Sequence, residues 1–129
     1  MKGQRIVSII FAASGVYDGV LGLIFVLAPA AMYARFGVTP PNHWGYVQFG
    51  AALLVIFGIM FLQVAWKPAP NRNLIPYGIL LKAAYCVTVF GYWFTRGLPD
   101  MWKPFAFIDA VFAVLFAWSW VRLGRAEAV

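Results

Sequence analysis

The sequence predicts an all-α integral membrane protein, with four transmembrane helices in an up-down-up-down bundle. The chain has 129 residues, of which 64% are hydrophobic and only 11% are charged. A soluble domain is nearer half apolar and a quarter charged. Four long apolar stretches fill almost the whole chain, and the short links between them favour antiparallel neighbours. We therefore expect a single transmembrane domain, residues 1–129.

Each predicted span has about the length that a bilayer requires, which is roughly 20 residues. The first ends at Pro29, and Pro76 and Pro104 fall in first turns, where a missing N–H is harmless. All six tryptophans lie close to a span end, as residues that prefer the membrane interface should. The predicted spans are about 6–28, 44–66, 74–95 and 104–123.

The distribution of lysine and arginine predicts the orientation. Basic residues concentrate on the side that carries both termini, and the positive-inside rule places that side in the cytoplasm. We expect a multi-pass protein of the bacterial inner membrane with cytoplasmic N- and C-termini. The net charge of +6 then suits anionic lipid headgroups. Nucleic acid is not an expected partner, because the basic residues are scattered. Those on the cytoplasmic side are Lys2, Arg5, Lys67, Arg72, Arg122 and Arg125; those opposite are Arg35, Arg96 and Lys103.

Three ionisable residues, Asp18, Lys82 and Asp109, lie inside the predicted spans. A charge at the bilayer centre costs at least ~2.5–3.5 kcal/mol, so such residues face one another, a cavity or a partner. At 1.5 Å per residue they lie ~18, ~12 and ~20 Å from the cytoplasmic ends of their helices. The long lysine stem covers the difference in depth. The sequence therefore predicts one intramembrane polar site in which Lys82 reaches at least one aspartate.

Three further polar residues, Tyr17, Gln48 and Tyr85, fall at similar depth and complete the predicted ligand or proton site. Two acids and one base leave one carboxylate uncompensated, and a buried lone carboxylate is usually neutralised by a proton or a ligand. We assign that role to Asp18, because glycines surround it and leave space: Gly15, Gly19 and Gly22. Asp109 is then the structural partner of Lys82.

Catalytic and metal chemistry have little support in the sequence. Cys86 is the only cysteine and His43 the only histidine, so neither an intrachain disulfide nor a metal or haem site is expected. No nucleophile or phosphate-loop motif is present. We expect a protein that is not an enzyme on its own and holds no metal.

One pattern carries a resemblance to a known group. Leu27-Ala28-Pro29, then Phe36-Gly37, then the run from Gln48 to Gly58 resemble the DoxX-like small four-helix bacterial membrane proteins. In some of these a similar unit is the membrane subunit of a quinone-linked sulfur oxidoreductase. The resemblance implies an accessory or quinone-facing role. The basic residue that often follows the glycine of the first helix in that group is replaced here by Tyr17-Asp18-Gly19.

Three interpretations of the polar site remain open at this point. Lys82 could pair with the aspartates only to hold the bundle in register. The site could instead bind an amphiphilic ligand such as a lipid or quinone, in a binding protein or accessory subunit of a larger membrane complex. The third interpretation is a proton-coupled transporter or channel that works as a homo-oligomer. In each case the lipid bilayer is the first partner.

Overall fold

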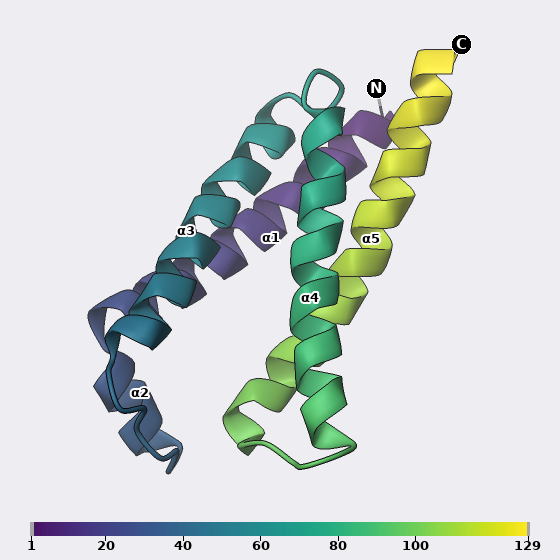
Figure 1. Cartoon of the computed structure of the whole chain (residues 1–129). Coiled ribbons are helices and arrows are strands. Elements are labelled where there is room, and N and C mark those ends of the chain that lie inside the picture. Colours follow the sequence, from purple (N-terminus) through teal and green to yellow (C-terminus); the bar gives the residue numbers. More distant parts are fainter. Residues whose placement is uncertain (1, 129) are drawn as a thin grey trace.

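The structure, a computed structural model, describes residues 2–128, and these residues form helices and loops without any strand. Successive long helices run in opposite directions, and both ends of the chain lie at the same end of the molecule (Figure 1). We call this the terminus end. Four helices are long and apolar enough to cross a membrane, α4 and α5 each together with the short turn before it. The long helices are α1 Lys2–Leu27, α3 Gly45–Trp66, α4 Ile75–Trp93 and α5 Lys103–Ala128.

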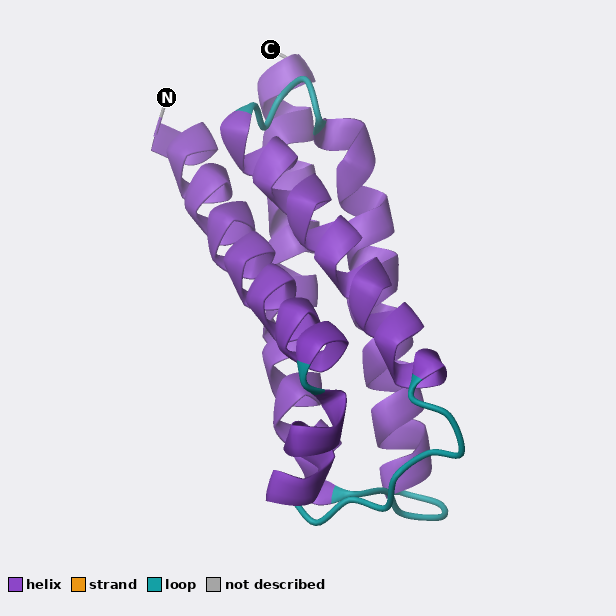
Figure 2. Ribbon diagram, turned by 90° about the vertical axis from the view of Figure 1, so that its left-hand side faces the viewer, coloured by secondary structure: helices purple, strands orange, loops and turns teal. Residues whose placement is uncertain are grey.

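The remaining elements are short and sit in the connections (Figure 2). Helix α2, Pro29–Arg35, follows α1 after one residue and begins with a proline, which suits a first helical turn. A short outer helical turn is predicted at this place by the sequence. Two 3₁₀ turns, η1 Arg72–Leu74 and η2 Asp100–Trp102, lead into α4 and α5.

The helices extend beyond two of the predicted spans. Helix α1 begins at Lys2 rather than at residue 6, and α5 continues to Ala128 rather than ending at 123. The prediction marked where apolar side chains stop. A helix can continue past that point, because its backbone hydrogen bonds do not depend on the polarity of the side chains.

The bundle is built as two antiparallel pairs. Helix α1 packs most closely on α3 and α4 on α5, whereas α3 and α4 contact each other little. A Cβ added to Gly58 of α3 would lie 2.8 Å from the backbone N of Gly19 and 2.9 Å from the carbonyl of Gly15. The first pair therefore meets backbone to backbone, which small residues permit.

Two apolar clusters hold the pairs together at opposite ends. Near the terminus end, the rings of Phe11 and Phe116 stack with centroids 4.2 Å apart, and Phe61 packs edge-on against Phe116 at 5.0 Å. All three rings are fully buried. The cluster at the other end contains Phe25, Tyr33, Ala51 and Met101. The three ionisable residues of the predicted site, Asp18, Lys82 and Asp109, lie along their helices between the two clusters.

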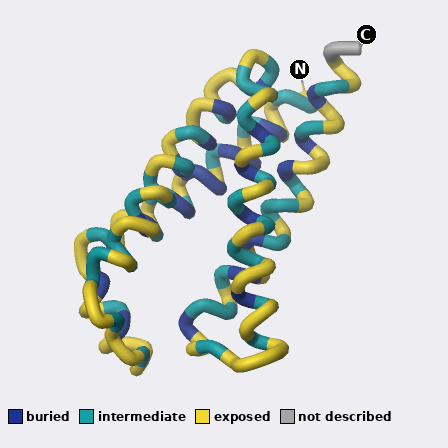
Figure 3. The backbone as a smooth tube through the Cα atoms, in the orientation of Figure 1, coloured by how far each residue is buried: buried dark blue, intermediate teal, exposed yellow. Residues whose placement is uncertain are grey.

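The outer surface of the bundle is apolar. Ile9, Ile56, Leu80 and Val114, one from each long helix, are all more than half exposed. Figure 3 shows exposed segments along the outward sides of the helices. Extended exposed apolar area of this kind marks a surface that meets lipid or a partner rather than water.

The α3–α4 turn is fastened at the terminus end. The Arg72 guanidinium lies 3.6 Å from the ring centroid of Trp120, and its Nε donates to the Trp120 carbonyl at 3.0 Å. The Asn71 amide donates to the carbonyls of Gln63 and Lys67 at the end of α3. Asn71 thereby caps α3, because Lys67 follows its last residue, Trp66, where carbonyls lose their helical donors.

Candidate functional site

Lys82 joins three helices through two ion pairs. Its Nζ lies 2.5 Å from Asp18 Oδ2 on α1 and 3.1 Å from Asp109 Oδ1 on α5. Lys82 is 0% exposed, Asp18 1% and Asp109 7%. The sequence predicts contact with at least one aspartate, and the structure contains both. We refer to these three residues as the triad.

Helical spacing on α1 and α4 places the triad on inward faces. On α4, Gly78 precedes Lys82 by four residues and both are buried. On α1, Ser14 precedes Asp18 by four residues, and its hydroxyl donates to Asp18 Oδ2 at 3.4 Å. Residues four apart lie on the same side of a helix. Asp18 therefore has two hydrogen-bond donors, whereas Asp109 has one.

The ammonium of Lys82 is enclosed by aromatic rings on its other sides. Its Nζ lies 5.3 Å from the ring centroid of Phe112, 5.5 Å from that of Phe61 and 5.6 Å from that of Tyr17. A cation over ring faces is attracted by their quadrupoles, and more so where water is excluded. This enclosure offsets part of the cost of burying the charge.

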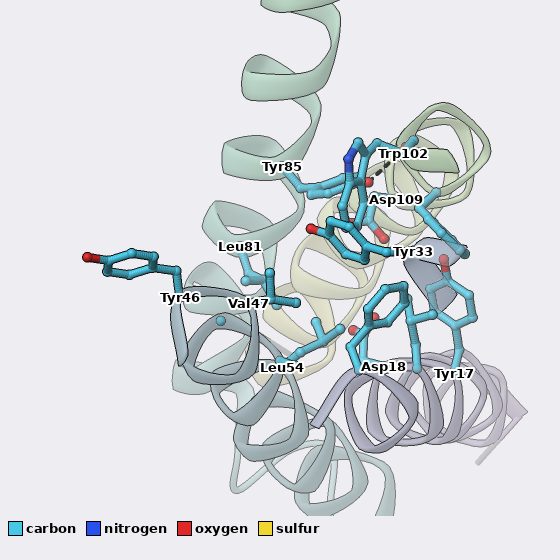
Figure 4. A pocket seen from close by; sticks show the side chains of 15 residues that line it. Tyr17, Asp18, Tyr33, Tyr46, Val47, Leu54, Leu81, Tyr85, Trp102 and Asp109 are labelled. Carbon is cyan, nitrogen blue, oxygen red and sulfur yellow. Dashed lines mark hydrogen bonds between the residues drawn. The ribbon is translucent and has the colours of Figure 1, made fainter. Parts of the chain in front are cut away.

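A cavity of about 360 Å³ lies beside the triad (Figure 4). Asp18 and Asp109 belong to its wall, whereas Lys82 does not. The remaining wall is mostly apolar and comes from both helix pairs and from α2. A volume of this size falls at the lower end of small-molecule sites. Apart from Tyr46, the aromatic residues in this wall are Tyr17, Phe25, Tyr33, Tyr85, Trp102 and Phe105.

The cavity reaches the molecular surface on the α3 side. Tyr46 and Gly50 of α3 belong to its wall and are both exposed. Tyr46 points away from the other lining side chains (Figure 4). A Cβ added to Gly50 would meet no atom within 4 Å. Because α3 and α4 contact each other little, this opening lies between the two helix pairs.

Three tyrosines in the wall differ in their hydrogen bonding. The Tyr85 hydroxyl donates to the Trp102 carbonyl at 2.8 Å. The Tyr17 hydroxyl is buried and has no hydrogen-bond partner among residues 2–128. Tyr33 extends from α2 across the cavity (Figure 4), and burial raises the pKa of its phenol, which stays neutral. An unpaired buried hydroxyl is costly, so Tyr17 marks a place where a further partner would be stabilising.

Of the six residues predicted for the site, five lie together and Gln48 does not. Tyr17, Tyr85 and both aspartates line the cavity, with Lys82 directly behind them. The Gln48 side chain instead donates to the Val26 carbonyl at 3.0 Å. That carbonyl belongs to the last turn of α1, where helical partners are missing. Gln48 therefore ties α3 to α1, a role that depth alone could not reveal.

The prediction that glycines open a space around Asp18 is wrong for two of them. A Cβ added to Gly15 would lie 2.9 Å from the Gly58 carbonyl, and one added to Gly22 would lie 2.7 Å from the Ala51 carbonyl. These glycines bring α1 against α3 and leave no room there. The space beside Asp18 is the cavity between the helix pairs.

The predicted division of roles between the aspartates is also not what the geometry supports. Asp18 has the shorter contact to Lys82 and a second donor in Ser14, whereas Asp109 has one longer contact and greater exposure. Asp109 is therefore the less compensated carboxylate.

The sequence did not single out Ser14, Phe25, Tyr33 and Trp102. Ser14 had a usable signal, its four-residue spacing from Asp18 on one helix face. Tyr33 had none, because its place over the cavity depends on how α2 turns after Ala28. Comparisons with protein families, with curated proteins and with solved structures find no match to this chain.

Proposed function

We propose that this protein is a small integral membrane protein that binds an amphiphile in the cavity between its two helix pairs. The observation that carries the proposal is a cavity of about 360 Å³ with a mostly apolar wall, in which Asp18 and Asp109 are the charged residues. The polar head would lie at the carboxylates and the apolar part along the remaining wall. Sites of this kind are mostly apolar with a few placed polar groups that fix orientation.

The outer surface supports a membrane location for this binding. Apolar side chains are exposed along all four long helices, so these helices are suited to lipid. The opening between α3 and α4 would then face the hydrocarbon. An amphiphile dissolved in the bilayer could enter sideways without crossing water. We propose the bacterial inner membrane, with the terminus end in the cytoplasm, as the setting.

A purely structural role for the triad explains less of the geometry. Ion pairs that only fix the register of a bundle need no cavity next to them. Here both carboxylates border open space, and the hydroxyl of Tyr17, which also lines the cavity, is buried without a partner among residues 2–128. A bound ligand accounts for both features.

Filling the cavity should abolish binding. Gly50 lines the cavity and has open space at its Cβ position, so Gly50→Phe should place a ring there without displacing backbone. Gly91 of α4 is also exposed, also has open space and lies outside the wall, so Gly91→Phe is the matched control. The probes are octylammonium, 1-octanol and octanoate, measured by equilibrium dialysis in maltoside micelles with empty micelles as the blank.

We expect at least one probe to bind the wild-type protein above the blank. Gly50→Phe should reduce that binding at least about ten-fold, and Gly91→Phe should leave it unchanged, because only the first substitution competes with the ligand for volume. If no probe binds, or if the two variants bind alike, the proposed function is overturned and the register role of the triad remains.

A further inference from the structure

We infer that the ligand of this cavity is a single-chain amphiphile with an ammonium head, which donates hydrogen bonds to Asp109 and Asp18. This inference rests on the proposed function and names the chemistry of its ligand. Three independent features of the cavity lead to it: the sign of the buried charge, the kind of hydrogen-bonding groups left unpaired, and the size and aromatic character of the wall.

The net buried charge of the site favours a cationic ligand. Among residues 2–126, whose side chains the structure describes, the buried charged ones are Asp18, Lys82 and Asp109, which together carry one excess negative charge when all three are ionised. An uncompensated buried charge is strongly destabilising. A ligand with one positive charge would balance the site, whereas an anionic head would add repulsion. Lys82 cannot offer its charge to an anion, because it lies behind the carboxylates and outside the wall.

The unpaired oxygens of the two aspartates are hydrogen-bond acceptors. Both contacts of Asp18 use Oδ2 and the one contact of Asp109 uses Oδ1. One oxygen of each carboxylate is thus left without a hydrogen-bond partner within the described range 2–128. The Tyr17 hydroxyl can also accept. An ammonium has up to three donors and matches this set, and charge-assisted bonds of this type are the strong ones.

A quinone matches these groups less well. Its polar atoms are carbonyl oxygens, which accept hydrogen bonds and would face two carboxylates that accept as well. The Tyr17 and Tyr33 hydroxyls and the Trp102 indole are donors in the wall, and the Tyr85 hydroxyl is already bonded to the Trp102 carbonyl, but the ionised carboxylates themselves can only accept. The chemistry of the wall therefore favours a donor head over a quinone.

The walls fit a cation with one apolar chain. Rings of Tyr17, Tyr33, Trp102 and Phe105 surround the space next to the carboxylates, and aromatic surfaces attract organic cations. Leu54 and Leu81 supply aliphatic surface to the same wall. About 360 Å³ is near the lower limit for small-molecule sites. This volume accommodates one short chain and excludes a two-chain lipid.

The test compares three probes of equal chain length that differ in the charge of the head. Octylammonium is cationic at neutral pH, since alkylamines titrate near the lysine value of about 10.4; 1-octanol is neutral and octanoate is anionic. Binding to the full chain is measured by equilibrium dialysis in maltoside micelles. The variants are Asp109→Asn, Tyr17→Phe and the pair Gly50→Phe and Gly91→Phe.

We expect octylammonium to bind the wild type at least about ten-fold more tightly than 1-octanol, and octanoate not to bind. Asp109→Asn should weaken the binding of octylammonium at least about ten-fold and leave the binding of 1-octanol unchanged. Loss of one charge-assisted hydrogen bond corresponds to about this change in affinity. This variant should fold, because Asp18 and Lys82 remain as a neutral pair. Tyr17→Phe keeps the ring and should weaken octylammonium several-fold by removing an acceptor.

The outcomes separate this inference from the proposed function. If 1-octanol or octanoate binds as tightly as octylammonium and Gly50→Phe abolishes that binding, the cavity binds amphiphiles but the ammonium assignment is wrong. If Asp109→Asn and Tyr17→Phe both bind octylammonium as the wild type does, the assignment is likewise overturned. Displacement of octylammonium by phosphatidylethanolamine, which carries an ammonium on two chains, would overturn the single-chain assignment. Failure of all three probes to bind overturns the proposed function itself.

Discussion

Lys82 is the residue on which the centre of the bundle depends. It lies at 0% exposure between two carboxylates and three aromatic rings, and it connects α1, α4 and α5. A buried ion pair adds little stability over an apolar pair of the same shape, but removal of one partner leaves the other charge buried and alone. Removal of Lys82 should therefore have a large effect on stability, and its size should depend on which aspartates remain charged.

Lys82→Met should lower the free energy of unfolding by about 3–5 kcal/mol, because two carboxylates then face each other without a cation. The same substitution should cost at least about 1 kcal/mol less when Asp18→Asn is already present, since residues in one ion-pair network are coupled. Unfolding in mixed micelles by titration with dodecyl sulfate, followed by circular dichroism, measures both values.

The partly exposed pair of Lys103 and Asp100 supplies the control. Their side chains are 2.6 Å apart, and that of Asp100 is 93% exposed. Lys103→Met and Asp100→Asn should change stability by less than about 1 kcal/mol and add independently, because surface pairs contribute little. Additive losses in the cycle of Lys82 and Asp18 would contradict the coupling described here.

At the scale of elements, glycine contacts define the first helix pair and exclude the ligand from it. A methyl group added to Gly15 or Gly22 of α1 would come too close to the backbone carbonyls of Gly58 and Ala51 on α3. The second pair uses other groups: the Cys86 Sγ on α4 lies 3.3 Å from the Ala106 carbonyl on α5. Close packing within the pairs leaves the free volume between them.

Gly58→Ala should destabilise the bundle by about 1–3 kcal/mol, because the added methyl would press on the backbone of Gly15 and Gly19 and rigid backbone cannot yield. Gly91→Ala adds the same methyl to a helix position with open space. There stability should be unchanged or rise by up to about 1 kcal/mol, since alanine favours helix. The dodecyl sulfate titration compares the two, and equal effects would argue against backbone contact between α1 and α3.

At the scale of the whole molecule, the arrangement of the helices places both termini and the α3–α4 turn at one end and α2 at the other (Figure 1). The cavity lies toward the α2 end, and the rings of Phe11, Phe61 and Phe116 lie on the terminus side of the triad. A site with an opening at the side and packed rings beneath it suits binding better than conduction. Transport by a homo-oligomer and membership of a larger complex stay predictions.

The terminus end should face the cytoplasm. Single cysteines at Thr39 and Asn73, both exposed, should be placed in a Cys86→Ser background, which keeps a donor toward the Ala106 carbonyl. A membrane-impermeant maleimide added to intact cells should label Thr39→Cys and spare Asn73→Cys, because basic residues concentrate at the terminus end. Labelling of Asn73→Cys alone would reverse the orientation. Asn71 is a poorer position, since its side chain bonds the end of α3.

Much of this protein is determined by its sequence alone. The four long helices follow from apolar runs bounded by Pro29, Pro76 and Pro104, because backbone groups in an apolar medium must bond within their own segment. The meeting of Lys82 with the aspartates follows from their similar depth, because isolated charges are too costly in that medium. Such features depend on composition and on distance along one helix, which a sequence contains directly.

Only the tertiary structure decided which residues form the binding site. The rotation of each helix about its axis sends Gln48 to the Val26 carbonyl, while Tyr33 of α2 turns across the cavity. Packing of α1 on α3 occupies Gly15 and Gly22 and leaves the space on the other side of Asp18. These outcomes depend on how several helices share one volume. A periodic pattern along the chain specifies the face of each helix, whereas their mutual packing determines where a cavity remains.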